Sequence, residues 1–84
     1  MMKILYFAWV RERIGKPEED IELPGDVKTP ADLLAFLRTR GPEYESAFAE
    51  PDVIRVAADQ THVEHDMPIT DAREIALFPP MTGG

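Results

Sequence analysis

The residues best suited to chemistry stand at the C-terminus, where Pro79-Pro80-Met81-Thr82-Gly83-Gly84 follows a strand-like run and ends on a diglycine carboxylate. Proline fixes φ near −65° and has no amide hydrogen, so this segment is expected to leave the body of the protein extended, outside any central strand. Six residues span about 20 Å, enough to thread a narrow tunnel in another protein. Because glycine has no Cβ, Gly83 and Gly84 would let the tunnel walls close around the chain. The Gly84 carboxylate is therefore the candidate reactive group.

The other residues form no set that would make the chain an enzyme by itself. The sequence has no cysteine, which excludes disulfides, thiol nucleophiles and thiolate metal sites. It contains no glycine loop of the phosphate-binding type and no supported Ser/His/Asp arrangement. His62 and His65 lie outside any predicted helix and do not have the spacing of a metal site, so we expect no bound metal. Chemistry at Gly84 would have to be supplied by another protein.

Composition limits the size and the partners of this chain. Its 84 residues, 44% of them hydrophobic, predict a single small domain over residues 1–78, followed by an extended tail over residues 79–84. A net charge of −7 argues against nucleic acid or an anionic membrane as partner, because both would repel it. No membrane-spanning stretch or signal peptide is apparent, so we expect a cytoplasmic protein.

The elements that must position the tail can be read from periodicity and from turn residues. Thr29 as N-cap, Pro30 at the first helical position and Asp32 at the third predict a helix, which Gly41 is expected to end. Asp59-Gln60 is the expected tip of a hairpin. A short second helix is expected over residues 43–49, and the expected strands are residues 3–10, 19–23, 53–58, 61–63 and 74–78. This order indicates the α+β class, with a mixed sheet packed on one main helix.

Alternation along the predicted first and last strands indicates an exposed apolar face. Lys3 marks the solvated side of the first strand, and the side chains expected to share that side, together with one from the last strand, are Leu5, Phe7, Trp9 and Phe78. Such a patch would be a docking surface, unless loops of the domain itself cover both faces. The run Glu18-Glu19-Asp20 is expected to be a solvated set of charges.

Three segments resemble a known family. They are the first strand with Phe7-Ala8-Trp9-Val10-Arg11-Glu12, the hairpin at Asp59-Gln60-Thr61, and the ending Asp71 to Gly84 with Leu-Phe-Pro-Pro-Met-Thr-Gly-Gly. Together they resemble the small subunit of molybdopterin synthase, a family of ubiquitin-like sulfur carriers. The resemblance covers most of the chain and implies a β-grasp fold.

The resemblance also implies a reaction at the tail. An E1-like enzyme would use MgATP to adenylate Gly84, and a sulfur donor would convert it to a thiocarboxylate. The sulfur would pass to cyclic pyranopterin monophosphate, forming the molybdopterin dithiolene of the molybdenum cofactor. The implied partners are the adenylating enzyme and a large catalytic subunit, in an assembly of two large and two small subunits. No cofactor would be bound by this chain.

Particular residues carry over from that family. Phe7 and Phe78 match positions that contact the large subunit, and Arg11 matches a basic position directed toward it. His62 stands where a leucine is usual, which would make docking weakly dependent on pH. The residues that would enter the partner's active site with Gly84 are Pro79, Pro80, Met81, Thr82 and Gly83.

Three alternatives remain open at this point. The same carrier chemistry could serve thiazole assembly for thiamine or the thiolation of tRNA. The chain could instead be a non-catalytic β-grasp binding module whose tail is inert. It could also be a modifier that forms amide bonds to lysines of other proteins.

Overall fold

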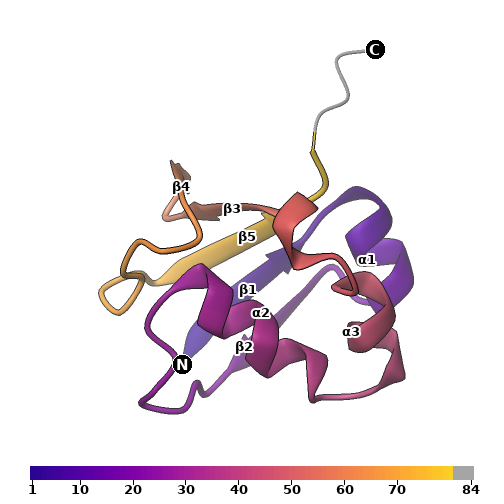
Figure 1. Cartoon of the computed structure of the whole chain (residues 1–84), viewed down its shortest axis with the longest axis horizontal. Coiled ribbons are helices and arrows are strands. Elements are labelled where there is room, and N and C mark those ends of the chain that lie inside the picture. The colour runs from indigo at the N-terminus through magenta and orange to yellow at the C-terminus, as the bar shows by residue number, and fades with distance from the viewer. Residues whose placement is uncertain (81–84) are drawn as a thin grey trace.

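The computed structural model describes residues 1–80 and shows a five-stranded mixed sheet with helices (Figure 1). The strands are arranged in the order β2-β1-β5-β3-β4. Their bounds are β1 Met2–Tyr6, β2 Glu18–Ile21, β3 Arg55–Ala58, β4 Thr61–Val63 and β5 Glu74–Phe78. The helices are α1 Ala8–Ile14, α2 Pro30–Arg38, α3 Pro42–Ala47 and the 3₁₀ turn η1 Pro51–Val53.

Strand directions bring the ends of β1 and β5 together. β1 runs parallel to β5 and antiparallel to β2, while β5 and β4 each run antiparallel to β3. The last residues of β1 and β5, Tyr6 and Phe78, therefore lie at the same end of the sheet (Figure 1). Asp59 and Gln60 form the predicted hairpin tip, with φ of 48° and 71°, as a two-residue turn of the type I′ class requires.

The start of helix α2 follows the sequence prediction. The Thr29 side chain accepts a hydrogen bond from the Asp32 amide, and the Asp32 carboxylate accepts one from the Thr29 amide, which completes a capping box. The predicted end of this helix is wrong. Helix α2 stops at Arg38 with Thr39 as its C-cap, and Gly41 is the N-cap of α3.

The core lies between the sheet and the helices. Alternate side chains of β1 and β5 are buried, among them Ile4 and Leu77, and they form one hydrophobic cluster with the leucines of α2. The helices pack on this face of the sheet (Figure 1). The arrangement is the β-grasp fold that the resemblance implies.

The first strand is shorter than predicted. It ends at Tyr6, and residues 8–14 form α1, whereas the sequence analysis continues the strand to Val10. The physical reason is burial of Val10 and Ile14. These residues are four apart, so on a helix they lie on the same side and are both buried. A strand that ended at Val10 would not place both of them in the core. Gly15, with φ of 88°, ends α1 in the left-handed conformation typical of a helix C-terminus.

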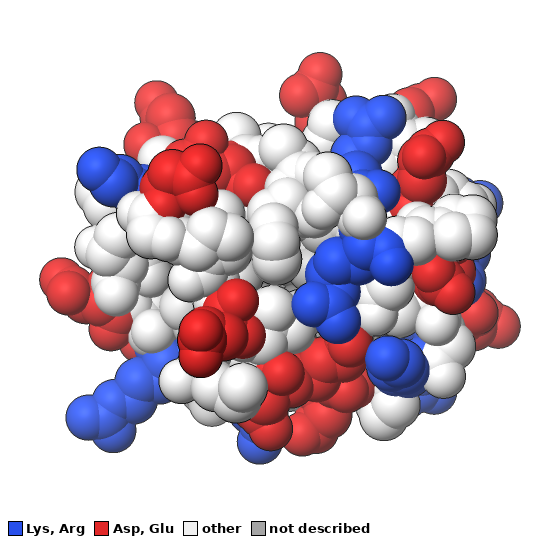
Figure 2. Space-filling view, turned by 90° about the horizontal axis from the view of Figure 1, so that it is seen from below, with Lys and Arg blue, Asp and Glu red and all other residues white. Residues whose placement is uncertain are grey.

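Charge is spread over the molecular surface. On the face in Figure 2, acidic and basic side chains are interspersed with uncharged areas, and several acidic groups gather at its lower middle. Within residues 1–80, no helix is both long and apolar enough to cross a membrane.

Candidate functional site

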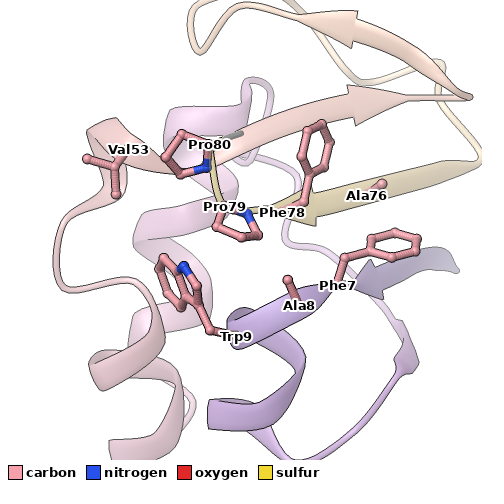
Figure 3. A pocket seen from close by; sticks show the side chains of 8 residues that line it. All are labelled: Phe7, Ala8, Trp9, Val53, Ala76, Phe78, Pro79 and Pro80. Carbon is pink, nitrogen blue, oxygen red and sulfur yellow. The ribbon is translucent and has the colours of Figure 1, made fainter. Parts of the chain in front are cut away.

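An apolar groove of about 900 Å³ opens where β1 and β5 end (Figure 3). Its walls come from the junction of β1 with α1, from β5 and the residues after it, and from η1. The groove is lined by Phe7, Ala8, Trp9, Val53, Ala76, Phe78, Pro79 and Pro80. Because Pro79 and Pro80 form part of the wall, the last described residues of the chain lie at this surface.

Two phenylalanines form one side of the groove. Phe7 follows β1, its amide donates to the carbonyl oxygen of Leu77 at 3.1 Å, and 46% of its surface is exposed. Phe78 is the last residue of β5 and is half-buried. Figure 3 shows both aromatic rings on the same side of Pro79. An aromatic residue as exposed as Phe7, beside further apolar side chains, is typical of a docking surface.

The other side of the groove depends on α1. Ala8, the first residue of this helix, has φ of 53°, which turns the chain from the strand direction into the helix. The next residue, Trp9, lies below Val53 and Pro80 in Figure 3 and lines the groove with them. The guanidinium of Arg13 lies 4.6 Å from the centre of a Trp9 ring, which makes a cation–π contact.

The predicted patch is partly correct. Phe7, Trp9 and Phe78 line the groove, although Trp9 reaches it from a helix and not from a strand. Leu5 does not line it; this residue pairs with Ala76 across the outer face of the sheet and is half-buried. Since Phe7 is 46% exposed, loops of the domain do not cover this end of the surface.

Two predicted partner residues lie away from the groove. Arg11 is exposed on α1 and lines a shallow hollow with Gly15, Lys16 and Pro17. His62 is exposed on β4 and pairs with Ala57, on the same outer face as Phe78 but beyond β3. Met81, Thr82, Gly83 and Gly84 are outside the described residues, so their predicted roles stay predictions.

Glu19 departs from the sequence prediction. It was expected in a solvated charge run, but only 9% of its side chain is exposed. Its Oε2 accepts hydrogen bonds from the hydroxyls of Tyr6 at 2.7 Å and Tyr44 at 2.6 Å. Its Oε1 lies 3.1 Å from both Lys16 Nζ and Arg40 Nη2. The reason is register: Glu19 pairs with Ile4, so its side chain projects toward the helices like that of Ile4.

The surroundings of Glu19 stabilise its charged form. Burial by itself raises the pKa of this carboxyl, but hydrogen bonds from Tyr44, Tyr6 and Lys16 outweigh burial and hold the pKa below its ordinary value. Burial and the hydrogen bond to Glu19 raise the pKa of both tyrosines, so their hydroxyls keep their protons and act as donors.

The two histidines have different environments. His65 is half-buried, and its Nε2 lies 2.7 Å from the carbonyl oxygen of Ile54, so this nitrogen carries the proton and donates. His62 is exposed on the edge strand. In the part of the chain that the structure describes, no three His, Cys, Asp or Glu side chains are grouped so as to hold a metal ion.

Sequence reasoning missed Ala8, Val53 and Ala76 as groove residues. The spacing of Val10 and Ile14, followed by glycine, was the available signal for α1 and hence for the position of Ala8. Val53 was assigned to a strand, but Pro51 opens a 3₁₀ turn that presents it at the surface, 37% exposed.

Comparison with known proteins gives the family. The sequence profile of the ThiS family matches residues 4–84. The chain belongs to the ThiS family. Within that family it is 36% identical to the molybdopterin synthase sulfur carrier subunit of Escherichia coli (strain K12), over 100% of both chains. It is 37% identical to the protein of the same name from Dictyostelium discoideum, over 98% of this chain and 94% of that one. The resemblance found in the sequence is thus confirmed.

Solved structures agree with this ThiS family assignment. The putative molybdopterin converting factor subunit 1 from Pyrococcus furiosus is 28% identical, with a TM-score of 0.74 over 95% of this chain and 97% of that one. SAMP1 from Haloferax volcanii, also described as small archaeal modifier protein 1, is 30% identical, with a TM-score of 0.74 over 99% of this chain and 98% of that one.

Proposed function

We propose that this chain is a sulfur carrier and the small subunit of a molybdopterin synthase. The observation that carries the proposal is full-length similarity, at 34–37% identity, to proteins named molybdopterin synthase sulfur carrier subunit. The groove supports it, because an apolar surface lies beside the point where the C-terminal segment leaves β5. A carrier of this kind needs both a docking surface and a segment that reaches the partner's active site.

The proposed reaction begins at the Gly84 carboxylate. A carboxylate is a resonance-stabilised anion and a poor electrophile, so an E1-like enzyme first joins it to AMP, with MgATP as substrate and pyrophosphate as the leaving group. The terminal sulfur of a persulfide donor displaces AMP, and a thiol reduces the resulting acyl disulfide. The product is a Gly84 thiocarboxylate, whose sulfur is a better nucleophile than oxygen.

The second half of the reaction takes place on the large subunit. The thiocarboxylate sulfur displaces an oxygen substituent from a carbon of cyclic pyranopterin monophosphate. Water then hydrolyses the resulting thioester, which leaves the sulfur on the pterin and returns Gly84 to the carboxylate form. Two loaded carriers supply the two dithiolene sulfurs, in accordance with an assembly of two large and two small subunits. In this scheme the chain binds no cofactor and is not a catalyst by itself.

The described residues suggest which part of the chain docks on the large subunit and which part reaches its active site. Phe7 and Phe78 in the groove would dock on the large subunit, and Arg11 and His62 would contact it outside the groove. The segment from Pro79 to Gly84 would reach the active site. Because the two prolines also line the groove, docking would fix the direction in which the tail leaves the body.

Mass spectrometry tests the carrier chemistry. The chain would be coexpressed with its adenylating enzyme and a sulfur source, and fragmentation would locate any replacement of oxygen by sulfur. We expect the replacement at Gly84, and we expect an alkylating reagent to trap it. Localisation is essential because oxidation of a methionine adds nearly the same nominal mass. A chain lacking Gly84 is the control, and an unmodified Gly84, when a known carrier is loaded in parallel, would refute the proposal.

A second function is favoured by the similarity to small archaeal modifier protein 1. A modifier uses the same activated glycine but forms an amide bond to a lysine of another protein. The same coexpression experiment separates the two functions. Adducts of higher mass that survive reduction indicate a modifier, whereas a thiocarboxylate and no adducts indicates a dedicated sulfur carrier.

Docking through the groove has a well-matched control. Phe7 and Met67 are equally exposed, at 46% each, but only Phe7 lines the groove. We expect Phe7→Ala to weaken binding of the large subunit about tenfold or more, in the range of an aromatic interface residue, and Met67→Ala to leave binding unchanged. Titration calorimetry with the purified large subunit measures both. Equal effects of the two substitutions would contradict docking through this groove.

A further inference from the structure

Helix α1, which forms one wall of the groove, is short and has few stabilising features at its N-terminal end. It contains seven residues, fewer than an isolated helix needs to be stable in water. Its N-cap, Phe7, offers no side-chain hydrogen bond, and its first turn contains no acidic residue. Its first residue, Ala8, adopts φ of 53°, a conformation that costs an L-residue free energy. The position of α1 must therefore be fixed by contacts outside the helix.

The Glu19 carboxylate contacts the chain on both sides of α1. Tyr6, two residues before the helix, donates its hydroxyl to Oε2 at 2.7 Å. Lys16, two residues after the helix, places its ammonium 3.1 Å from Oε1. Glu19 itself belongs to β2, so one side chain of the sheet binds the start and the end of the segment that contains α1.

The same carboxylate also fixes the neighbour of α1. Tyr44, in α3, donates to Oε2 at 2.6 Å, and Arg40, just before α3, lies 3.1 Å from Oε1. Helices α1 and α3 pack against each other. Hydrogen bonds to an ionised, partly buried carboxylate are stronger than those between neutral groups, so this cluster is well suited to holding strained backbone in place.

We propose that Glu19 is a positioning residue of the docking groove: its carboxylate holds both flanks of α1 and so fixes Phe7, Ala8 and Trp9 in the groove wall. The local arrangement is independent of what docks there. The consequence of this arrangement for sulfur transfer rests on the proposed function. A displaced α1 would change the shape of the groove wall and so weaken binding of the large subunit.

The chain provides an internal reporter and a matched control. Trp9 is its only tryptophan and lines the groove, so quenching of its fluorescence by acrylamide reports the accessibility of the wall directly. Glu18 is the neighbouring residue of the same strand, but its carboxylate is half-exposed and, within residues 1–80, its one salt bridge is to Lys3, at 3.4 Å. Glu19→Gln and Glu18→Gln therefore remove the same charge from adjacent positions, and only the first disturbs the contacts around α1.

The test compares these two variants with the wild type under conditions in which all three are folded. For Glu19→Gln we expect the quenching constant of Trp9 to rise about twofold, and amide hydrogen exchange in α1 to become about tenfold faster while exchange in α2 is unchanged. Glu18→Gln should behave as the wild type. If Glu19→Gln does not fold, Tyr6→Phe, which removes only the contact before α1, should produce the same pattern to a smaller extent.

A different pattern would overturn the proposal. If exchange accelerates equally in α1 and α2 and the quenching of Trp9 is unchanged, Glu19 supports only the overall stability of the fold. Both readouts use the chain alone, so they do not depend on whether Gly84 accepts sulfur. If the proposed function is wrong, the mass spectrum will show an unmodified Gly84. If this inference is wrong, the quenching of Trp9 and the amide exchange of α1 will not change as expected.

Discussion

Substitution of Asp59 tests how the hairpin fixes the strand that leads to the tail. Asp59 is the first residue of the turn between β3 and β4 and has φ of 48°. Its Oδ1 accepts hydrogen bonds from the amides of Arg73 and Glu74, both at 3.0 Å, where β5 begins. Its own amide donates to the carbonyl oxygen of Glu74 at 2.9 Å. One residue thus adopts the left-handed conformation that the turn requires and also holds the start of β5 through hydrogen bonds.

The cost of replacing Asp59 can be divided into two parts. Two hydrogen bonds to an exposed carboxylate contribute about 1 kcal/mol each. The left-handed conformation costs alanine about 1 kcal/mol more than it costs aspartate, asparagine or glycine. We therefore expect Asp59→Ala to lower the free energy of unfolding by about 3 kcal/mol. For Asp59→Gly we expect a loss of about 2 kcal/mol, because the hydrogen bonds are missing and the freedom of glycine at positive φ offsets its larger entropic cost. Asp59→Asn retains an acceptor oxygen and the tolerance of positive φ, so we expect a change within about 0.5 kcal/mol.

Urea unfolding, followed by circular dichroism at pH 7, measures the three variants. A loss of 3 kcal/mol corresponds to a fall in melting temperature of roughly 15 °C for a domain of this size, so thermal unfolding provides a second measurement. The ranking Asn, Gly, Ala from least to most damaging is the essential result. If Asp59→Asn is as damaging as Asp59→Ala, the carboxylate charge matters and the acceptor geometry does not, and the reasoning is wrong.

Two further predictions concern α1 and Glu19. Ala8→Gly is expected to raise the free energy of unfolding by about 0.5–1 kcal/mol, because relief of the left-handed conformation at φ of 53° exceeds the entropic cost of glycine; a lower urea midpoint would contradict this. The stability provided by Glu19 is expected to be fully present above its unfolded pKa of about 4.3 and to be lost as pH falls through its lower folded pKa. Urea unfolding between pH 7 and pH 3 should therefore show a smaller acid-induced loss for Glu19→Gln than for the wild type, and equal losses would refute the role of this carboxylate.

Local signals predicted the elements whose causes are local. The capping residues Thr29 and Asp32, the alternation of residues 74–78 and the turn at Asp59 each act through neighbours in the sequence, and the structure places an element at each of them. The end of β1 was missed because residues 7–10 are aromatic, β-branched or small and fit a strand as readily as a helix.

Contacts between segments distant in the sequence determined the features that local signals did not predict. Nothing near Glu19 in the sequence distinguishes it from Glu18. Its side chain is partly buried because its register against β1 directs it toward Tyr44, 25 residues away. Val53 likewise joins the groove because η1 lies beside the end of β5, a proximity that no local pattern specifies.

The sequence by itself determined the family, the α+β class, the apolar character of Phe7 and Phe78, and the diglycine ending, because these depend on residue identity and short spacing. The tertiary structure decided that Phe7 and Phe78 share one groove with Trp9 and Val53, and that Glu19 is a partly buried acceptor and not a solvated charge. The physical reason is that parallel pairing of β1 with β5 and the register of β2 are set by burial of the whole core, a sum over distant contacts that no single segment contains.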